Sequence, residues 1–275
     1  MNPQRGASVH CAGVAVPPAS MKMFRDRRPL KRWRYVGFYG PELMLCAGDA
    51  HIGPLRQRFW ALATPDGRIR ESTSLFGSGG VRMRGPELAI DGDGVRVRLR
   101  VEEAGGGVET LSPHGGSYIW TRKQGGVRMS GLVELEGHPI QLEGRGVVDD
   151  SAGYHARHTV WCWSAGVGRL VDGRPLAWNL VTGVHDAPEA SERTVWVDGE
   201  ASEVAPVAFA ADLSAIQGNP LELRFTEWCA REDDTNALLL RSKYRQPFGL
   251  FAGTLGPGLE LHDGYGVMES HDVHW

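Results

Sequence analysis

Regular alternation of apolar and polar residues is the feature that most constrains how this chain can fold. The segment Val95–Val101 reads VRVRLRV, with Val and Leu on one side and Arg on the other. This period of two is typical of a β-strand with one side facing water. Similar runs follow one another from Trp33 onward and stop at turn signals such as Pro65-Asp66-Gly67. Much of the chain's Gly, 37 residues in all, lies in short turn-like clusters, so we expect many short strands and few helices.

The length sets the number of β-domains. At 275 residues the chain is too long for one small barrel. Two antiparallel barrels, or one barrel packed on a second sheet, are the simplest all-β architectures of this size. We expect residues 1–32 to be a flexible leader, residues 33–145 an N-terminal β-domain and residues 146–275 a C-terminal one. Met21 is an alternative start of the native chain.

Charge and cysteine usage limit the partners. A formal net charge of -3 gives no reason to expect nucleic acid as a partner. No apolar run approaches the roughly 20 residues of a membrane-spanning helix, and the N-terminus has no signal-peptide core. The four scattered Cys form no zinc motif and are typical of reduced thiols, although disulfides stay open. We therefore expect a cytoplasmic protein without an integral membrane segment, and the oligomeric state, a homo-oligomer included, is open.

The segment from Asp149 to Asp186 concentrates the chemistry of the chain. It holds three His, three Trp, one Tyr and four Asp. Strand alternation places His155, Trp161 and Trp163 on one face, and a turn at Asp172-Gly173 brings Trp178 or Asn179 beside them. Aromatic walls with a few polar groups predict a pocket for an apolar ligand.

Each of these residues also has a simpler interpretation. Trp163 and Trp178 are compatible with an ordinary core, and His155 and His158 with structural hydrogen bonding. The pair Asp149-Asp150 can cap a turn. The three histidines His155, His158 and His185 match no established metal-ligand spacing, so no metal is expected. No phosphate-binding loop, dinucleotide fingerprint or nucleophile elbow is present, so no cofactor is expected either.

A set of short motifs in a particular order gives the chain a family resemblance. The motifs are Trp33-Arg34-Tyr35, Val148-Asp149, Gly153-Tyr154, Trp161-Cys162-Trp163, Trp178-Asn179-Leu180, Ser191-Glu192-Arg193, Gln246-Pro247-Phe248-Gly249 and Gly266-Val267-Met268-Glu269. With these the chain resembles a bacterial family of unknown function. That family is related to the lipocalin-like carotenoid hydratases (hydroxyneurosporene synthases) and to other two-barrel calycin-type proteins.

The resemblance implies tandem lipocalin-like β-domains with an apolar ligand cavity. In the hydratase relatives an acidic residue protonates an alkene and water captures the carbocation, while aromatic and His residues line the site. We expect ligand contacts also from Tyr154, His185, Glu192 and Glu269. In the hydratases the acid lies on the strand after the paired Trp; here that strand carries Asn179 and no carboxylate.

Two functional hypotheses follow. The first is an enzyme, a hydratase or cyclase that acts on a hydrophobic isoprenoid-like or polyketide-like substrate by acid–base chemistry. Asp149 or Asp186 would be its acid, and His155 or His158 the partner that orients it or handles water. The second is a non-catalytic carrier of a lipid or pigment. A cavity filled by side chains would instead leave a structural protein.

Overall fold

The computed structural model describes residues 1–75, 77–103, 105, 107–237 and 240–275. The regular secondary structure of this part of the chain is β-strand, apart from the 3-10 helix η1 (Gly6–Cys11). Among these residues no helix has the length and apolar character needed to cross a bilayer. The strands of the first half are β1 (Gln4–Arg5), β2 (Phe24–Arg25), β3 (Arg28–Pro29), β4 (Lys31–Tyr39), β5 (Met44–Ile52), β6 (Leu55–Ala63), β7 (Ile69–Ser74), β8 (Val81–Arg84), β9 (Glu87–Gly92), β10 (Val95–Glu102), β11 (Val108–His114), β12 (Ser117–Leu135) and β13 (His138–Gly153). Those of the second half are β14 (His158–Leu170), β15 (Pro175–Thr182), β16 (Thr194–Val197), β17 (Glu200–Glu203), β18 (Val207–Phe209), β19 (Ala215–Gly218), β20 (Glu222–Ala237), β21 (Leu240–Thr254) and β22 (Leu261–His274).

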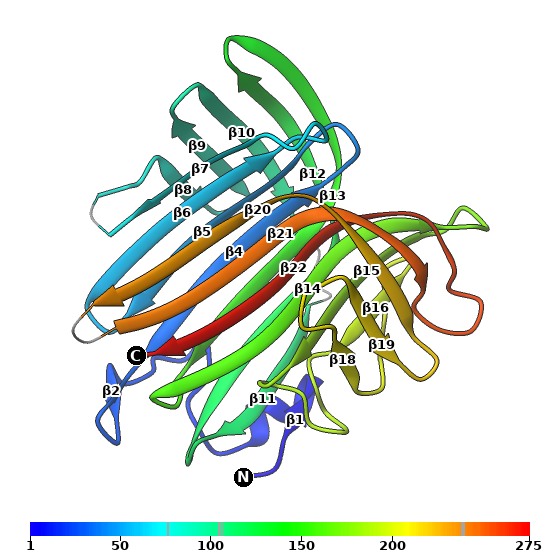
Figure 1. Ribbon diagram of the computed structural model, residues 1–275. Helices are drawn as coiled ribbons and strands as arrows, with labels where there is room; N and C mark the ends of the chain where they lie inside the picture. The colour runs from blue at the N-terminus through cyan, green and yellow to red at the C-terminus, as the bar shows by residue number, and fades with distance from the viewer. Residues whose placement is uncertain (76, 104, 106, 238–239) are drawn as a thin grey trace.

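Two large antiparallel sheets contain most of these strands, and both follow the same order (Figure 1). The first sheet runs β7-β6-β5-β4-β13-β12-β10-β9-β8, and the second runs β17-β16-β15-β14-β22-β21-β20-β19-β18. In each, the first long strand pairs with the last strand of its own half, β4 with β13 and β14 with β22. β11 is an addition to the first sheet and pairs with β12 and β1. The equal strand order confirms the expected all-β fold of tandem lipocalin-like halves.

Alternation along β4 gives this strand two packed faces. Val36 and Phe38 point into a core that the first sheet encloses. Tyr35 and Tyr39 point to the opposite side, into a cluster shared with Trp163 of the second sheet. Because side chains alternate, one strand can contribute to the core of its own half and also to the junction between halves.

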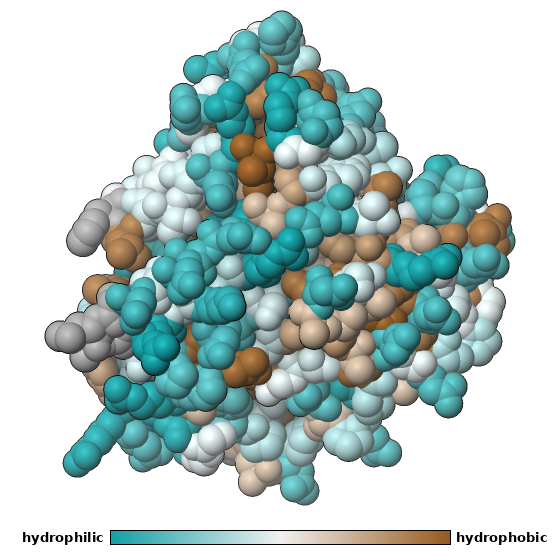
Figure 2. All heavy atoms as spheres, in the orientation of Figure 1, coloured by the Kyte–Doolittle hydropathy of each residue, from teal (hydrophilic) through white to brown (hydrophobic). Residues whose placement is uncertain are grey.

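One face of β10 is exposed to solvent and the other is buried, as its sequence predicts. Val95, Val97, Leu99 and Val101 are buried, and the arginines between them are exposed. Figure 2 shows hydrophilic side chains over most of the visible surface, with smaller hydrophobic areas between them.

The second sheet follows the same rule with two of the tryptophans. Trp178 is fully buried in a core enclosed by this sheet, where its ring meets Phe251 at a centroid distance of 4.9 Å. Trp163 points the other way, toward the first sheet. The two halves therefore have separate cores and share a third, central cluster.

The residues before Trp33 pack on the first sheet, which differs from the flexible leader expected from the sequence. β1 pairs with β11, and Val9 and Val16 are buried against Leu111 and Tyr118. Strand pairing and buried apolar side chains hold this segment in place. The chain passes from one sheet to the other between Gly153 and His158, because the whole of β13 belongs to the first sheet.

Candidate functional site

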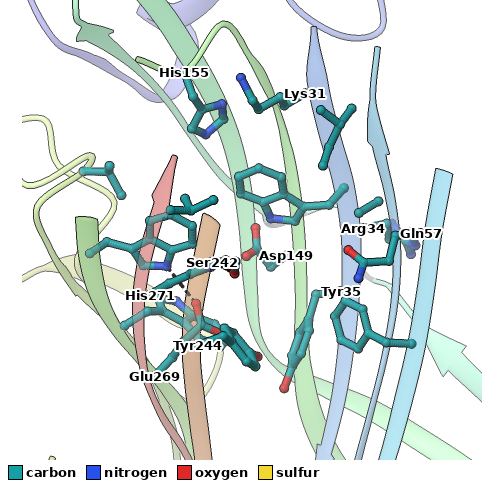
Figure 3. A pocket seen from close by; sticks show the side chains of 18 of the residues that line it. Lys31, Arg34, Tyr35, Gln57, Asp149, His155, Ser242, Tyr244, Glu269 and His271 are labelled. Carbon is teal, nitrogen blue, oxygen red and sulfur yellow. Dashed lines mark hydrogen bonds between the residues drawn. The ribbon is translucent and has the colours of Figure 1, made fainter. Parts of the chain in front are cut away.

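A cavity of about 410 Å³ lies between the two sheets (Figure 3). One wall comes from strands of the first sheet, mainly β4–β7, β12 and β13, and the other from strands of the second sheet, mainly β14 and β20–β22. His155 and His185 reach it from loops, and the exposed Leu75 and Asp233 lie where it opens to solvent. Its volume is within the range of small-molecule sites, roughly 300–1,000 Å³. The sequence placed the pocket inside a barrel, whereas both halves of the chain build it.

Aromatic side chains form much of the cavity wall. Trp161 and Trp163 lie two residues apart on β14, and Trp33 and Tyr35 two residues apart on β4. The spacing places both members of each pair on one strand face. Tyr35 and Trp163 meet edge to face across the cavity, with ring centroids 5.4 Å apart and planes at 85°. Such walls favour an apolar ligand, and their π faces can stabilise a cation.

Lys123, Asp149 and Glu192 form a buried ion cluster in this wall. Lys123 Nζ lies 2.8 Å from Asp149 Oδ2 and 3.3 Å from Glu192 Oε1. Thr121 Oγ1 donates a hydrogen bond of 2.9 Å to the second oxygen of Glu192. Burial lowers the pKa of Lys123, but the two carboxylates outweigh burial and hold that pKa above its usual value. One cation faces two carboxylates, so the cluster is negative unless a proton binds.

Asp149 has one carboxylate oxygen that no donor in the described part of the chain satisfies. This oxygen, Oδ1, is buried. The Trp33 indole lies close enough to lower the pKa of the carboxyl, but without the geometry of a hydrogen bond. Burial raises the pKa of Asp149, Lys123 opposes this, and the charge of Glu192 raises it further, so the net direction is upward. A carboxyl group in this environment can exchange a proton with a bound molecule.

Glu269 of β22 is the second carboxyl group on the cavity. Its Oε1 accepts a hydrogen bond from Trp161 Nε1 at 2.7 Å. Its Oε2 accepts from Tyr244 Oη at 3.1 Å and from Gln246 Nε2 at 3.0 Å. These three donors lack charge, and burial raises the pKa of Glu269 more than the hydrogen bonds lower it. A carboxylate offers about four lone-pair sites, so one is left for a proton.

The histidines on the cavity are neutral. Burial lowers the pKa of His155 well below its usual value, that of His185 to about 3 and that of His271 to about 4. His185 Nδ1 lies 2.9 Å from Ser112 Oγ, and His271 Nε2 lies 2.8 Å from Ser242 Oγ. Neutral imidazoles bind a ligand through one N–H and one lone pair each.

Two residues expected to act as acid or partner lie away from the cavity. Asp186 is exposed, and its Oδ2 accepts the Gly183 N–H at 2.8 Å in a local turn. His158 is exposed at the start of β14, 2.8 Å from Asp272 and stacked on His274. His158 is an odd number of residues from Trp161, so it points to the opposite face of the strand. Of the four expected catalytic residues, only Asp149 and His155 line the cavity.

Three expected ligand contacts also lie behind or away from the wall. Trp178 is in the core of the second sheet and donates to Ser164 Oγ at 3.0 Å. Tyr154 packs on Tyr118 and donates to a backbone carbonyl of the N-terminal segment. Asn179 supports the wall from behind: its Oδ1 accepts from Trp163 Nε1 at 2.7 Å, and its Nδ2 donates to the Glu192 backbone at 3.0 Å. The other expected contacts line the cavity: Trp161, Trp163, His185, Glu192 and Glu269.

Sequence reasoning missed several polar residues of the cavity. The main ones are Lys31, Lys123, Arg231, Tyr244 and His271. The position of Lys123 could have been inferred from its spacing. It lies two residues after Thr121 in a strand, so the two side chains lie on the same face, which is buried. The position of Arg231 could not be inferred in this way, because its burial depends on two residues of the first sheet. Its guanidinium carbon lies 4.4 Å from the centroid of the Phe59 ring, and its Nε pairs with Glu71.

The fold and the cavity together define a two-sheet, lipocalin-like β-protein with an aromatic cavity between its halves. An AttH-like protein from Nitrosomonas europaea has a similar structure, with a TM-score of 0.54 and 15% identity over 93% of this chain and 98% of that one. Kievitone hydratase from Nectria haematococca is also similar, with a TM-score of 0.53 and 9% identity over 87% of this chain and 88% of that one. At such identities the likeness concerns the fold.

Sequence comparison places the chain in a family. The profile described as "Domain of unknown function (DUF2804)" matches residues 78–275, and the chain belongs to this family. No curated protein is detectably similar to the chain in sequence.

Proposed function

We propose that this protein binds an apolar small molecule between its sheets and adds a nucleophile to it by acid–base chemistry, as a hydratase or cyclase. The aromatic walls suit an isoprenoid-like or polyketide-like skeleton. Asp149 and Glu269 supply the acid and base, so the proposal assigns the chemistry to side chains without a cofactor.

The observation that carries this proposal is the pair of buried carboxyl groups in unlike environments on one aromatic cavity. Asp149 contacts the Lys123 ammonium, which favours its ionised form. Glu269 contacts three uncharged donors and no cation within ion-pair distance among the described residues. Carboxyl groups whose environments differ in this way can divide the roles of acid and base. We assign the proton donor to Glu269 and the base to Asp149.

In the proposed hydration, the Glu269 carboxyl gives its proton to one carbon of an alkene. The alkene π electrons form the new C–H bond, and the other carbon becomes a carbocation beside the faces of Trp163 and Trp33. Water attacks that carbon, and Asp149 Oδ1 takes the proton that the water releases. In a cyclisation, the π electrons of a second double bond attack that carbon and leave a new carbocation, and Asp149 takes a proton from a carbon next to it, so that a double bond forms. Return of a proton from Asp149 to Glu269 through solvent completes the cycle.

Two likenesses support the proposal without deciding it. A structure with this fold is a kievitone hydratase, and the motif order resembles the carotenoid hydratases. The strand that carries the acid in those hydratases has Asn179 here, so the acid would come from a different strand, β22.

Incubation of kievitone in ¹⁸O-labelled water, followed by mass spectrometry, gives a first test. We expect a product heavier than kievitone by one labelled water. Glu269→Gln and Asp149→Asn should each lower its rate by at least about 10²-fold, whereas the exposed Asp186→Asn should leave the rate unchanged. A panel of prenylated and polyketide alkenes extends the test to other skeletons. Alkenes that bind tightly and return unchanged from every variant would contradict catalysis and favour the carrier.

We also propose that the protein works in the cytoplasm. All four cysteines are free thiols, and Cys46 and Cys229 are buried. Unpaired thiols are typical of a reducing compartment. Recovery of the protein with a disulfide from its native cells would contradict this location.

A further inference from the structure

Lys31 is a buried cation on the cavity that forms no ion pair with any of the described residues. The residue begins β4 and is 1% exposed, and its side chain lines the cavity. Its Nζ lies 4.7 Å from the ring centroid of Trp275. In the part of the chain that the structure describes, no carboxylate pairs with it, and Lys123 takes both Asp149 and Glu192. Burying a charge without a partner is costly, so such a group is rare unless it serves a ligand.

Two imidazoles beside Lys31 also have nitrogens without partners. His155 Nδ1 and His114 Nε2 are buried, and neither has a hydrogen-bond partner among the described residues. The two rings lie 5.9 Å apart, and the His155 ring lies 5.9 Å from Trp275, on which Lys31 rests. Figure 3 shows Lys31 directed toward His155 at one end of the cavity, away from Glu269 and Tyr244. Lys31 and the two imidazoles are therefore neighbours, and of the two imidazoles only His155 lines the cavity.

The charges near this end are positive. Burial and the nearby Arg28 lower the pKa of Lys31 to about 8, which leaves most of it protonated at neutral pH. Arg28 is itself held by the backbone carbonyls of His114 and Tyr154. On the cavity itself, Lys31 lies at the His155 end without an ion pair, whereas Lys123, paired with Asp149, and Glu269 lie further in.

We infer that the Lys31 end binds an oxyanion, the carboxylate or phenolate of an otherwise apolar ligand. The ammonium of Lys31 would pair with the oxyanion, and the imidazole of His155, which also lines the cavity, would add a hydrogen bond. This inference rests on the proposed ligand-binding role of the cavity. It adds a substrate class and an orientation: the acidic end lies at Lys31 and the apolar body extends between the tryptophans toward Glu269.

Two fluorescent probes with one aromatic frame test the inference. Anilinonaphthalene sulfonate carries an anionic group, and N-phenylnaphthylamine lacks it. We expect Lys31→Met to weaken binding of the anionic probe at least tenfold, since loss of one partner from a buried charge pair has a large effect. Binding of the neutral probe should change less than about twofold. Arg32→Met is the matched control, because Arg32 is exposed on the other face of β4, and Lys31→Arg should retain most of the affinity.

The outcomes separate this inference from the proposed function. Equal weakening of both probes, or an unchanged affinity for the anionic probe in Lys31→Met, would overturn the oxyanion site while the cavity proposal stands. Failure of both probes to bind the wild-type protein would contradict both. Displacement of the anionic probe by naphthoic acid supports a carboxylate ligand, and displacement by naphthol supports a phenolic one. Displacement that is equally strong in Lys31→Met would count against the site.

Discussion

Lys123 and Asp149 are register partners on β12 and β13, and their side chains meet at 2.8 Å on the face that looks into the cavity. In an antiparallel pair, directly opposed residues have Cβ atoms about 5 Å apart, so this contact is set by the strand register. Glu192 joins the pair from the loop before β16. The register of one hairpin thus positions the group that we propose as the base.

Loss of Lys123 should destabilise the protein strongly. Lys123→Met leaves two buried carboxylates without their cation, which should lower the free energy of unfolding by about 3–5 kcal/mol. Urea denaturation measures the change. Lys243→Met, at an exposed position on β21, should change it by less than about 0.5 kcal/mol. Adding Asp149→Asn and Glu192→Gln to Lys123→Met should recover much of the loss; no recovery would mean that packing, and not charge, explains it.

Acid should destabilise the fold through its neutral histidines. His271 has a pKa of about 4 in the folded protein and about 6.5 in the unfolded chain. Between these values only the unfolded chain binds the proton, so acidification favours unfolding. Between pH 6.5 and pH 4.5, the free energy of unfolding of the wild type should fall by roughly 2 kcal/mol more than that of His271→Gln. Urea titrations at both pH values test this, and parallel pH profiles would count against a neutral His271.

A bulkier residue at Gly125 should disturb the junction of the sheets. A Cβ atom there would lie 2.3 Å from the Trp196 ring, which comes from the second sheet. Gly125→Ala should therefore lower the free energy of unfolding by about 1–3 kcal/mol. Gly105→Ala, where the added atom meets nothing within 4 Å, is the control. Thermal unfolding of both variants makes the comparison, and equal melting temperatures would show that the junction adapts.

Asn179 should matter for stability and for the shape of the cavity, although it lies behind the wall. Asn179→Ala leaves the buried N–H of Trp163 without its acceptor, which should cost about 1–3 kcal/mol. A freed Trp163 should also shift the tryptophan emission and weaken binding of N-phenylnaphthylamine. The exposed Asn236→Ala should do neither. Unchanged emission and affinity in Asn179→Ala would argue against a supporting role.

Much of the aromatic wall could be predicted from local spacing. Trp161 and Trp163 are two residues apart, so any strand over this segment places them on one side. The same rule separates Trp178 from Asn179, but it does not say which of the two faces the ligand. Glu269 was expected only through the family resemblance, and the structure places it against Trp161.

The polar half of the site could not be predicted in this way. Asp149 was expected as a candidate acid, but Lys123 and Lys31 come from two other strands, and nothing in the local sequence relates them to it. His158 and Asp186 belong to the chemically richest stretch of the chain, but one faces away on β14 and the other closes a turn. The position of a residue in the sequence did not indicate its distance from the cavity.

The sequence by itself determined an all-β chain, its alternating faces and an aromatic strand face. These properties depend on a period of two residues, which the backbone imposes locally. Only the tertiary structure decided that the cavity lies between the sheets, that Lys123 pairs with Asp149, and that Lys31 is buried without a carboxylate partner among the residues the structure describes. Those facts depend on strand register and on the packing of one sheet against another, which arise from contacts between residues far apart in the chain.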